Sequence, residues 1–162
     1  MFTVAELPPE RWQEYRDIRL EALREEPAAF GSSYEEEVAM PEEEWKRRLG
    51  TMLFALEEGV PVGMISFAIS PRAKTGHIAH IYSVYVRRSA RGRGAGGALL
   101  KSALDRIKAH GGVLKVQLSV NPAMRPAVLL YERGGFVAQM RSEKELLVDG
   151  KFHALLYMEK IL

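Results

Sequence analysis

The spacing of apolar residues changes along the chain, and each change marks a predicted element. Phe2–Glu6 is predicted to be a short strand. The next helix should begin at Pro8 and Pro9, which suit a first turn, and should end before Pro27. A second helix is predicted over Pro41–Leu49. The buried face of the first helix consists of apolar residues at helical spacing, namely Trp12, Tyr15, Ile18, Ala22 and Leu23.

The centre of the chain predicts three strands and a long helix. Met52–Leu56 and Val62–Ile69 are apolar runs on either side of a Glu-Glu-Gly turn, which is typical of a hairpin. His77–Val86 is rich in β-branched and aromatic residues, which favours a buried strand. The period then becomes helical over Gly94–His110, and the two glycines that follow are typical of a helix end.

The last part of the chain predicts a strand over Val113–Val120 and a helix over Pro126–Arg133. Phe136–Val148 and Lys151–Ile161 then flank Asp149-Gly150, and this dipeptide between apolar runs is typical of a tight hairpin. The predicted order is β-α-α-β-β-β-α-β-α-β-β. This order indicates an α+β fold around a mostly antiparallel sheet.

Composition limits the class of protein. The 162 residues are 47% apolar and 27% charged, which is typical of one globular domain over residues 1–162. The absence of cysteine excludes a disulfide scaffold, a thiolate metal site and a cysteine nucleophile. No apolar run approaches the ~18 residues of a membrane helix, and no signal peptide is visible. We therefore expect a cytoplasmic protein with no membrane partner.

The glycine-rich turn after the third central strand carries the most chemical information. The formal net charge is only +2, but basic residues gather in RRSARGR, residues 87–93. A helix should begin at this point, and its first N–H groups have no internal partners and carry partial positive charge. Glycines permit close approach to that backbone. The turn therefore predicts a phosphate or pyrophosphate site, with a simple connecting turn as the alternative.

Two common phosphate motifs fit this turn poorly. Gly92, Gly94 and Gly97 match G-x-G-x-x-G, but the letters RRSAR separate them from the strand. The next strand also has no Asp or Glu that could bind the ribose of a dinucleotide. No G-x-x-x-x-G-K-[ST] occurs, which excludes a P-loop.

The turn resembles the cofactor motif of the GNAT superfamily of N-acetyltransferases. Arg91-x-x-Gly94-x-Gly96 matches [QR]-x-x-G-x-[GA], which grips the pyrophosphate of acetyl-coenzyme A in that family. The preceding IYSVYV is similar to the family's fourth strand, LYERGGF (residues 130–136) resembles its LYEKxGF segment, and RLEALREEPAAFGSSYEEE with Trp45 looks like its first two helices. The resemblance covers nearly the whole chain. It implies a mixed, mostly antiparallel six- to seven-stranded sheet flanked by about four helices.

The same resemblance implies direct attack of an amine on acetyl-coenzyme A in a ternary complex, without a metal. The pantetheine arm would lie between the fourth and fifth strands, along Val84, Tyr85 and Val86. An amide near Val84 would polarise the acetyl carbonyl, as in an oxyanion hole. The pyrophosphate would bind the amides of Arg91, Gly92, Arg93, Gly94, Ala95, Gly96 and Gly97.

Two proton transfers remain, one to the leaving thiolate and one from the attacking ammonium. Tyr131 matches the family's tyrosine acid, and a core residue with a satisfied hydroxyl is the alternative. His80 falls where some members place a glutamate base, and histidine is a residue type that often serves as a general base. Either His80 or a chain of water molecules is the base. The four histidines show no metal-binding spacing.

Further residues are assigned by position within the resemblance. Asn121 follows the fifth strand, where the family often has a cofactor-contacting asparagine, but its spacing from Tyr131 differs from the commonest form, and capping of the next turn is the alternative. The acceptor cleft is expected around Phe30, Ser33 and Tyr34. The neighbouring acids Glu35 to Glu37 either attract a cationic amine or are solvated, whereas Glu42 to Glu44 are expected to be solvated or to favour a helix N-terminus.

An N-acetyltransferase that uses acetyl-coenzyme A is therefore the leading function, with the acceptor amine unknown and a homodimer compatible with the resemblance. A non-catalytic acyl-coenzyme A binder is the first alternative. A nucleic-acid-binding module is disfavoured, because the chain has no aromatic-rich RNA motif and no broad basic face. The basic residues that such a module would use are Arg87, Arg88, Arg91 and Arg93.

Overall fold

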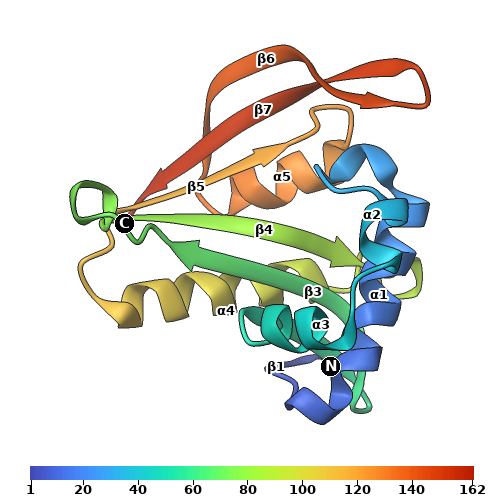
Figure 1. Cartoon of the computed structure of the whole chain (residues 1–162). Coiled ribbons are helices and arrows are strands. Elements are labelled where there is room, and N and C mark those ends of the chain that lie inside the picture. Colours follow the sequence, from blue (N-terminus) through green and yellow to red (C-terminus); the bar gives the residue numbers. More distant parts are fainter.

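The computed structural model describes all 162 residues and contains one seven-stranded sheet (Figure 1). The strand order is β1-β2-β3-β4-β5-β7-β6. Only β4 and β5 are parallel, and all other neighbours are antiparallel, which confirms the predicted mixed sheet. The strands are β1 (Thr3–Ala5), β2 (Met52–Glu57), β3 (Val60–Ile69), β4 (Ile78–Val86), β5 (Lys115–Val120), β6 (Val137–Val148) and β7 (Lys151–Ile161).

Five α-helices and four short 3-10 turns connect the strands. The helix α2 was not predicted as a separate element, because its five residues are too few to show a period. It begins with a capping box, in which Ser33 and Glu36 bond each other's backbone amides. The helices are α1 (Trp12–Glu25), α2 (Tyr34–Val38), α3 (Glu42–Leu49), α4 (Ala95–His110) and α5 (Arg125–Arg133), and the turns are η1 (Pro9–Arg11), η2 (Pro27–Ala29), η3 (Ala73–Thr75) and η4 (Arg88–Ala90).

Alternating side chains on the central strands divide the interior into two cores. On β2, Leu53 and Ala55 pack in the core that includes α4 and α5. Met52 and Phe54 point the other way, into the core that includes α1 and α3. The helices therefore cover both faces of the β1–β4 half of the sheet, as Figure 1 shows.

The central strands β4 and β5 separate soon after they begin. They pair only over Ile78–His80 and Lys115–Gln117, although β4 continues to Val86 and β5 to Val120. Figure 1 shows β5, β7 and β6 diverging from β4 as a second group of strands. Beyond His80 the facing edges of the two strands make no ladder with each other, so their backbone groups can bind a third, extended segment.

A bulge interrupts β4 at Ser83 and Val84. These two residues together face Ile65 alone, because the pairing with β3 shifts register at this point. Ser83 has a φ of +56°, in the left-handed region that residues other than glycine rarely adopt. A residue in such a conformation persists only where its surroundings hold it.

The last hairpin has the turn that the sequence predicts. Asp149 has a φ of +48° and Gly150 a φ of +74°. Two positive φ values are what a type I′ turn requires, and this turn matches the right-handed twist of the strands. The register then places β7 beside β5 and leaves β6 at the edge of the sheet.

Leu99 on α4 offers a test of the core beneath the sheet. It is fully buried, whereas Leu114 is 60% exposed. Leu99→Ala should lower the free energy of unfolding by about 2–5 kcal/mol, because it removes buried methyl groups and leaves a cavity. Urea denaturation measures this change. Leu114→Ala is the matched control, with an expected change below about 0.5 kcal/mol, and equal losses in the two variants would contradict this core.

Candidate active site

The turn between β4 and α4 presents a row of backbone amides at the start of a 16-residue helix. Gly94 is the N-cap with a φ of +92°, and Gly92 has a φ of +71°. The amides of residues 92–97 donate no hydrogen bond within the protein, and the first bond of the region runs from the Ala98 amide to the Gly94 carbonyl. These donors and the positive end of the helix dipole make the turn suited to bind an anion.

The glycines of this turn have two different roles. A Cβ atom at Gly92, Gly94 or Gly97 would meet no heavy atom within 4 Å, so these positions leave room above the amides. A Cβ atom at Gly96 would lie 3.3 Å from the side chain of Leu130. Gly96 therefore lets α5 pack against α4, whereas the other three leave the backbone accessible to a ligand.

The arginines of the turn are paired with carboxylates of other elements. Arg91 also donates from Nε to the carbonyl of Val86 at 2.8 Å, which braces the turn against the end of β4. These pairs engage part of each guanidinium, and the unpaired amides of residues 92–97 are further donors at the same turn. The four ion pairs are Arg87–Glu21, Arg88–Glu25, Arg91–Glu26 and Arg93–Glu57.

The end of β4 carries the residues expected to lie along a pantetheine arm. Val84 and Val86 pack toward α4, and Tyr85 is buried on the opposite face of the sheet. The hydroxyl of Tyr85 donates to Glu21 at 3.1 Å and to Glu25 at 2.9 Å. Burial, and then these two carboxylates, raise the pKa of Tyr85 above its ordinary value. Its side chain therefore joins α1 to β4 and leaves only its backbone for a ligand.

Tyr131 on α5 lies in the core under the sheet, with an exposed fraction of 5%. Its ring meets that of Phe136 edge to face, with 6.0 Å between centroids. Its hydroxyl makes no hydrogen bond within the protein, and burial raises its pKa. At neutral pH Tyr131 therefore keeps its proton, so its hydroxyl can donate a hydrogen bond.

His80 lies at the point where β4 and β5 part. It is the last residue of β4 that pairs with β5, opposite Gln117, and its ring stacks on Tyr82 at 6.1 Å between centroids. A cavity of about 310 Å³ opens beside it. The cavity is lined by His80, Ile81, Tyr82, Gln117, Leu118, Ser119, Gln139, Tyr157, Met158 and Glu159.

Sequence reasoning missed the other polar residues of this cavity. The signal is alternation for Gln117 and Ser119, which occupy the positions between buried apolar residues of β5, whereas Tyr82 is followed by the polar Ser83 and shows no such pattern. Tyr157 on β7 could not be found in this way, because its place opposite Ser119 depends on the pairing of distant strands.

A model of the acetyltransferase (GNAT) family matches residues 12–136, a span that contains the turn, His80 and Tyr131. The chain belongs to this family. A comparison with curated protein sequences finds no match. The family membership confirms the resemblance that rests on the turn and on LYERGGF.

Solved structures share the fold of this GNAT chain over its whole length. A GNAT acetyltransferase from Streptococcus pneumoniae superposes with a TM-score of 0.88 at 22% identity, covering 100% of both chains. A ribosomal-protein-alanine N-acetyltransferase from Brucella melitensis gives 0.83 at 22%, covering 99% of each chain. A phosphinothricin acetyltransferase from Sinorhizobium meliloti, solved with acetyl-coenzyme A, gives 0.82 at 19%, covering 99% of this chain and 88% of that one. At these identities the likeness establishes the GNAT fold.

None of the helices of this chain is long and apolar enough to pass through a membrane. No three side chains of the types His, Cys, Asp and Glu are grouped so that they could hold a metal ion.

Asn121 is engaged within the protein. It is 4% exposed, and its Nδ2 donates to the Ala28 carbonyl at 3.2 Å and to Nδ1 of His153 at 3.3 Å. Its Oδ1 accepts from the Ala123 amide at 3.0 Å. These bonds tie the end of β5 to η2 and β7 and favour the capping alternative, while a contact with a cofactor stays a prediction. A second cavity, of about 340 Å³, adjoins Asn121 between β6 and β7.

The three residues assigned to the acceptor have contacts of their own. Phe30 is buried under the guanidinium of Arg19, at 4.9 Å from the ring centroid. Ser33 caps α2, and Tyr34 lies under the guanidinium of Arg24 at 4.6 Å. None of the three lines either of the two cavities. Their role toward an acceptor stays a prediction that these contacts do not support.

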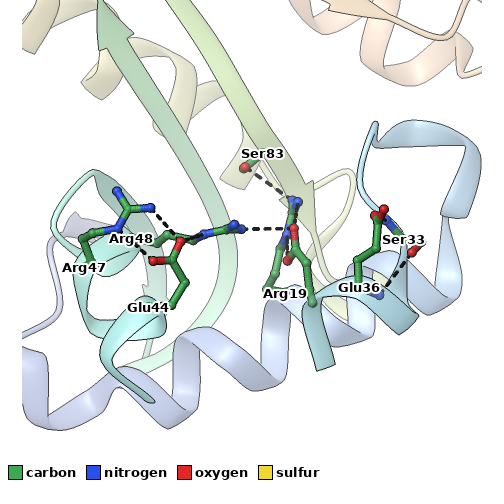
Figure 2. Close-up of polar contacts among 8 residues, drawn as sticks. Arg19, Ser33, Glu36, Glu44, Arg47, Arg48 and Ser83 are labelled. Carbon is green, nitrogen blue, oxygen red and sulfur yellow. Dashed lines mark hydrogen bonds and ion pairs between the residues drawn. The ribbon is translucent and has the colours of Figure 1, made fainter. Parts of the chain in front are cut away.

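The acidic residues of α2 and α3 behave differently from one another. Glu42 to Glu44 form the first turn of α3, as expected. Glu37 is neither solvated nor open to a ligand, because it is buried and receives two hydrogen bonds of 2.8 Å from Arg19 and one of 3.2 Å from Arg48 (Figure 2). Burial alone would raise the pKa of Glu37, but the hydrogen bonds and the attraction of these arginines outweigh it and hold the pKa below its ordinary range.

Removal of the Glu37 charge should destabilise the fold. Glu37→Gln should lower the free energy of unfolding at pH 7 by about 3–5 kcal/mol, because it leaves the buried Arg19 charge without an ionic partner. The lowered pKa means that the wild type has this contribution above the ordinary carboxyl pKa of 4.5 and loses it as the pH falls through the pKa of folded Glu37. The difference in unfolding free energy between the two proteins should therefore narrow as the pH falls below 4.5.

Urea denaturation of the wild type and of Glu37→Gln at several pH values measures this difference in unfolding free energy. Glu35→Gln is the matched control, because Glu35 is exposed on the same helix. A difference in unfolding free energy that stays constant from pH 7 to about pH 3 would show that the Glu37 carboxylate is not the source of the stabilisation.

Proposed function

We propose that the chain transfers an acetyl group from acetyl-coenzyme A to a primary amine in a ternary complex. The observation that carries this proposal is the divergence of β4 and β5 beside a helix start with unpaired amides at residues 92–97. An extended arm with amide groups fits the strand edges, and a diphosphate fits the helix start. The relative from Sinorhizobium meliloti, which was solved with acetyl-coenzyme A, supports this choice of ligand.

The residues present would hold the cosubstrate through backbone groups. The edge of β4 from Val84 to Val86 would bind the pantetheine arm, and the amides of Gly92 to Gly97 would bind the pyrophosphate. The amide of Arg91, which the sequence also assigned to the pyrophosphate, already donates to the Arg88 carbonyl at 3.3 Å. The open space above Gly94 and Gly97 leaves room for the phosphate oxygens. The ion pairs of the turn's arginines then stabilise the conformation of the loop and offset its positive charge.

The chemistry that follows is direct aminolysis of a thioester. The amine nitrogen forms a bond to the acetyl carbon while the bond from carbon to sulfur breaks, and the Val84 amide stabilises the negative charge on the carbonyl oxygen. His80 or a chain of water molecules takes the proton that the ammonium must lose. Tyr131, which burial keeps protonated, donates a proton or a hydrogen bond to the leaving thiolate.

The acceptor amine would approach from the side of the sheet that carries His80 and Tyr82. The cavity of about 310 Å³ beside His80 has both apolar and polar lining residues, which suits an organic amine. The turn η2 contacts β6 on this side, and Asn121 fastens η2 to the end of β5. The α1–α2 connection and the last hairpin would therefore flank the acceptor.

Calorimetry with acetyl-coenzyme A, followed by a thiol-release assay over a panel of amines, tests the proposal. The panel should include peptides with an N-terminal alanine, and phosphinothricin, because two of the structural relatives are named for such acceptors. Binding with turnover of at least one amine supports the acetyltransferase. Tight binding without turnover of any amine supports the alternative, a non-catalytic acyl-coenzyme A binder.

Gly94→Glu should abolish binding of acetyl-coenzyme A, because it places a negative side chain where the pyrophosphate would lie. Gly150→Glu is the matched control in the last hairpin, where a φ of +74° also lies in the left-handed region and the space is equally open. Calorimetry should give an unchanged Kd for the control and no measurable binding for Gly94→Glu. Unaltered affinity in Gly94→Glu would remove the turn from the site.

Tyr131→Phe should lower kcat roughly 100-fold, the size of a typical general-acid contribution, and leave the Kd of acetyl-coenzyme A unchanged. Steady-state kinetics and calorimetry measure the two effects separately. Tyr15→Phe is the matched control, since Tyr15 is also a buried tyrosine but packs in the core against α3. If kcat is the same in Tyr131→Phe and in the wild type, Tyr131 has no part in proton transfer.

A further inference from the structure

Arg19 on α1 connects α2 to the bulge of β4 (Figure 2). Its Nε and Nη2 atoms each donate to Glu37 on α2 at 2.8 Å, and its Nη1 atom donates to the hydroxyl of Ser83 on β4 at 3.3 Å. The side chain of Arg19 is 7% exposed and that of Glu37 is 3% exposed. A buried guanidinium thus reaches one residue in the middle of a central strand.

The Arg19 guanidinium is held in one orientation by groups on other elements. The two parallel bonds to Glu37 fix its plane, and the ring of Phe30 lies under it at 4.9 Å. Arg48 binds the same Glu37 carboxylate at 3.2 Å and thereby fixes the carboxylate as well. In Figure 2 this chain of ion pairs continues from Arg48 through Glu44 to the exposed Arg47.

A buried ion pair is weak evidence for stability, because desolvation of the two charges offsets much of their attraction. The desolvation of two buried charges is better explained where the ion pair fixes a geometry that apolar side chains could not fix. The Arg19–Glu37 pair leaves Nη1 directed at Ser83, and Ser83 has the strained φ of +56°. The hydroxyl of Ser83 has no hydrogen-bond partner in the protein other than Arg19.

The bulge also lacks support from the neighbouring strand. The pairing of β4 with β5 ends at His80, so β5 does not hold Ser83 or Val84. On the other side, the pairing with β3 places only Ile65 opposite Ser83 and Val84. The hydrogen bond from the Arg19 side chain to Ser83 therefore tethers the segment that includes the Val84 amide.

We propose that Arg19 is a positioning residue, which holds the Ser83 bulge so that the Val84 amide keeps its place for acetyl transfer. The inference rests on the proposed function, because the role of Val84 comes from it. Arg19 touches neither the acetyl group nor the amine. It acts through Ser83, and Glu37 acts through Arg19.

Two variants weaken the tether in different ways. Ser83→Ala removes the hydroxyl, leaves the Arg19–Glu37 pair intact and retains a Cβ atom at the strained φ. Arg19→Lys keeps a charge for Glu37 but cannot bind Glu37 and Ser83 at once with a planar fork. Ser70→Ala and Arg47→Lys are the matched controls, because Ser70 bonds Thr75 in the turn after β3 and Arg47 lies at the exposed end of the chain of ion pairs.

Kinetics should separate positioning from simple structural support. In Ser83→Ala and Arg19→Lys, kcat should fall about tenfold, as expected for the loss of one hydrogen bond to a charged group, while the Kd of acetyl-coenzyme A changes less than about twofold. The double variant should lose no more than the worse single variant, because both changes remove the same bond. The two controls should keep the wild-type kcat.

Hydrogen exchange tests the tether without any need for activity. The peptide over residues 81–86 should exchange faster in Ser83→Ala and Arg19→Lys than in the wild type and the controls. Unchanged exchange, an unchanged kcat in folded Ser83→Ala, or additive losses in the double variant would each overturn the inference. If the wild type neither binds nor uses acetyl-coenzyme A, the proposed function fails, and with it the role in acetyl transfer, while exchange still decides whether Arg19 tethers the bulge.

Discussion

The structure depends on the early separation of two parallel strands in the middle of the sheet. After three paired residues on each strand, β4 and β5 no longer bond to each other. Backbone groups at the centre of a sheet are costly to leave without partners. In this fold the cost arises between β4 and β5, where they separate. The helix start with unpaired amides follows the end of β4. The two features together support the proposed binding of acetyl-coenzyme A, a long ligand that is anionic at one end.

The helix α1 braces both ends of the open part of β4. Near its end, Glu21, Glu25 and Glu26 pair with arginines of the turn and bind the hydroxyl of Tyr85. One turn earlier, Arg19 reaches Ser83. The turn is thus braced by pairs of opposite charge, which limit its net positive charge.

The comparisons and the geometry support different parts of the conclusion. The family match establishes a GNAT acetyltransferase domain, and the solved structures establish the fold. The family match leaves the acceptor open. In the proposed function, the acceptor is chosen by residues of the cavity beside His80, which β4, β5 and the last hairpin bring together.

Local patterns in the sequence determined the elements, because period, turn chemistry and helix ends act over a few residues. The strands, the four longer helices, the Asp149-Gly150 turn and the glycine turn could all be read in this way. The separation of β4 from β5, the burial of Glu37 against Arg19, and the engagement of Asn121 by Ala28 and His153 could not. Each of these joins residues that are distant in the chain. Their burial and partners follow from strand order and helix packing, so only the tertiary structure decided whether an acidic residue faces water, a ligand or an arginine.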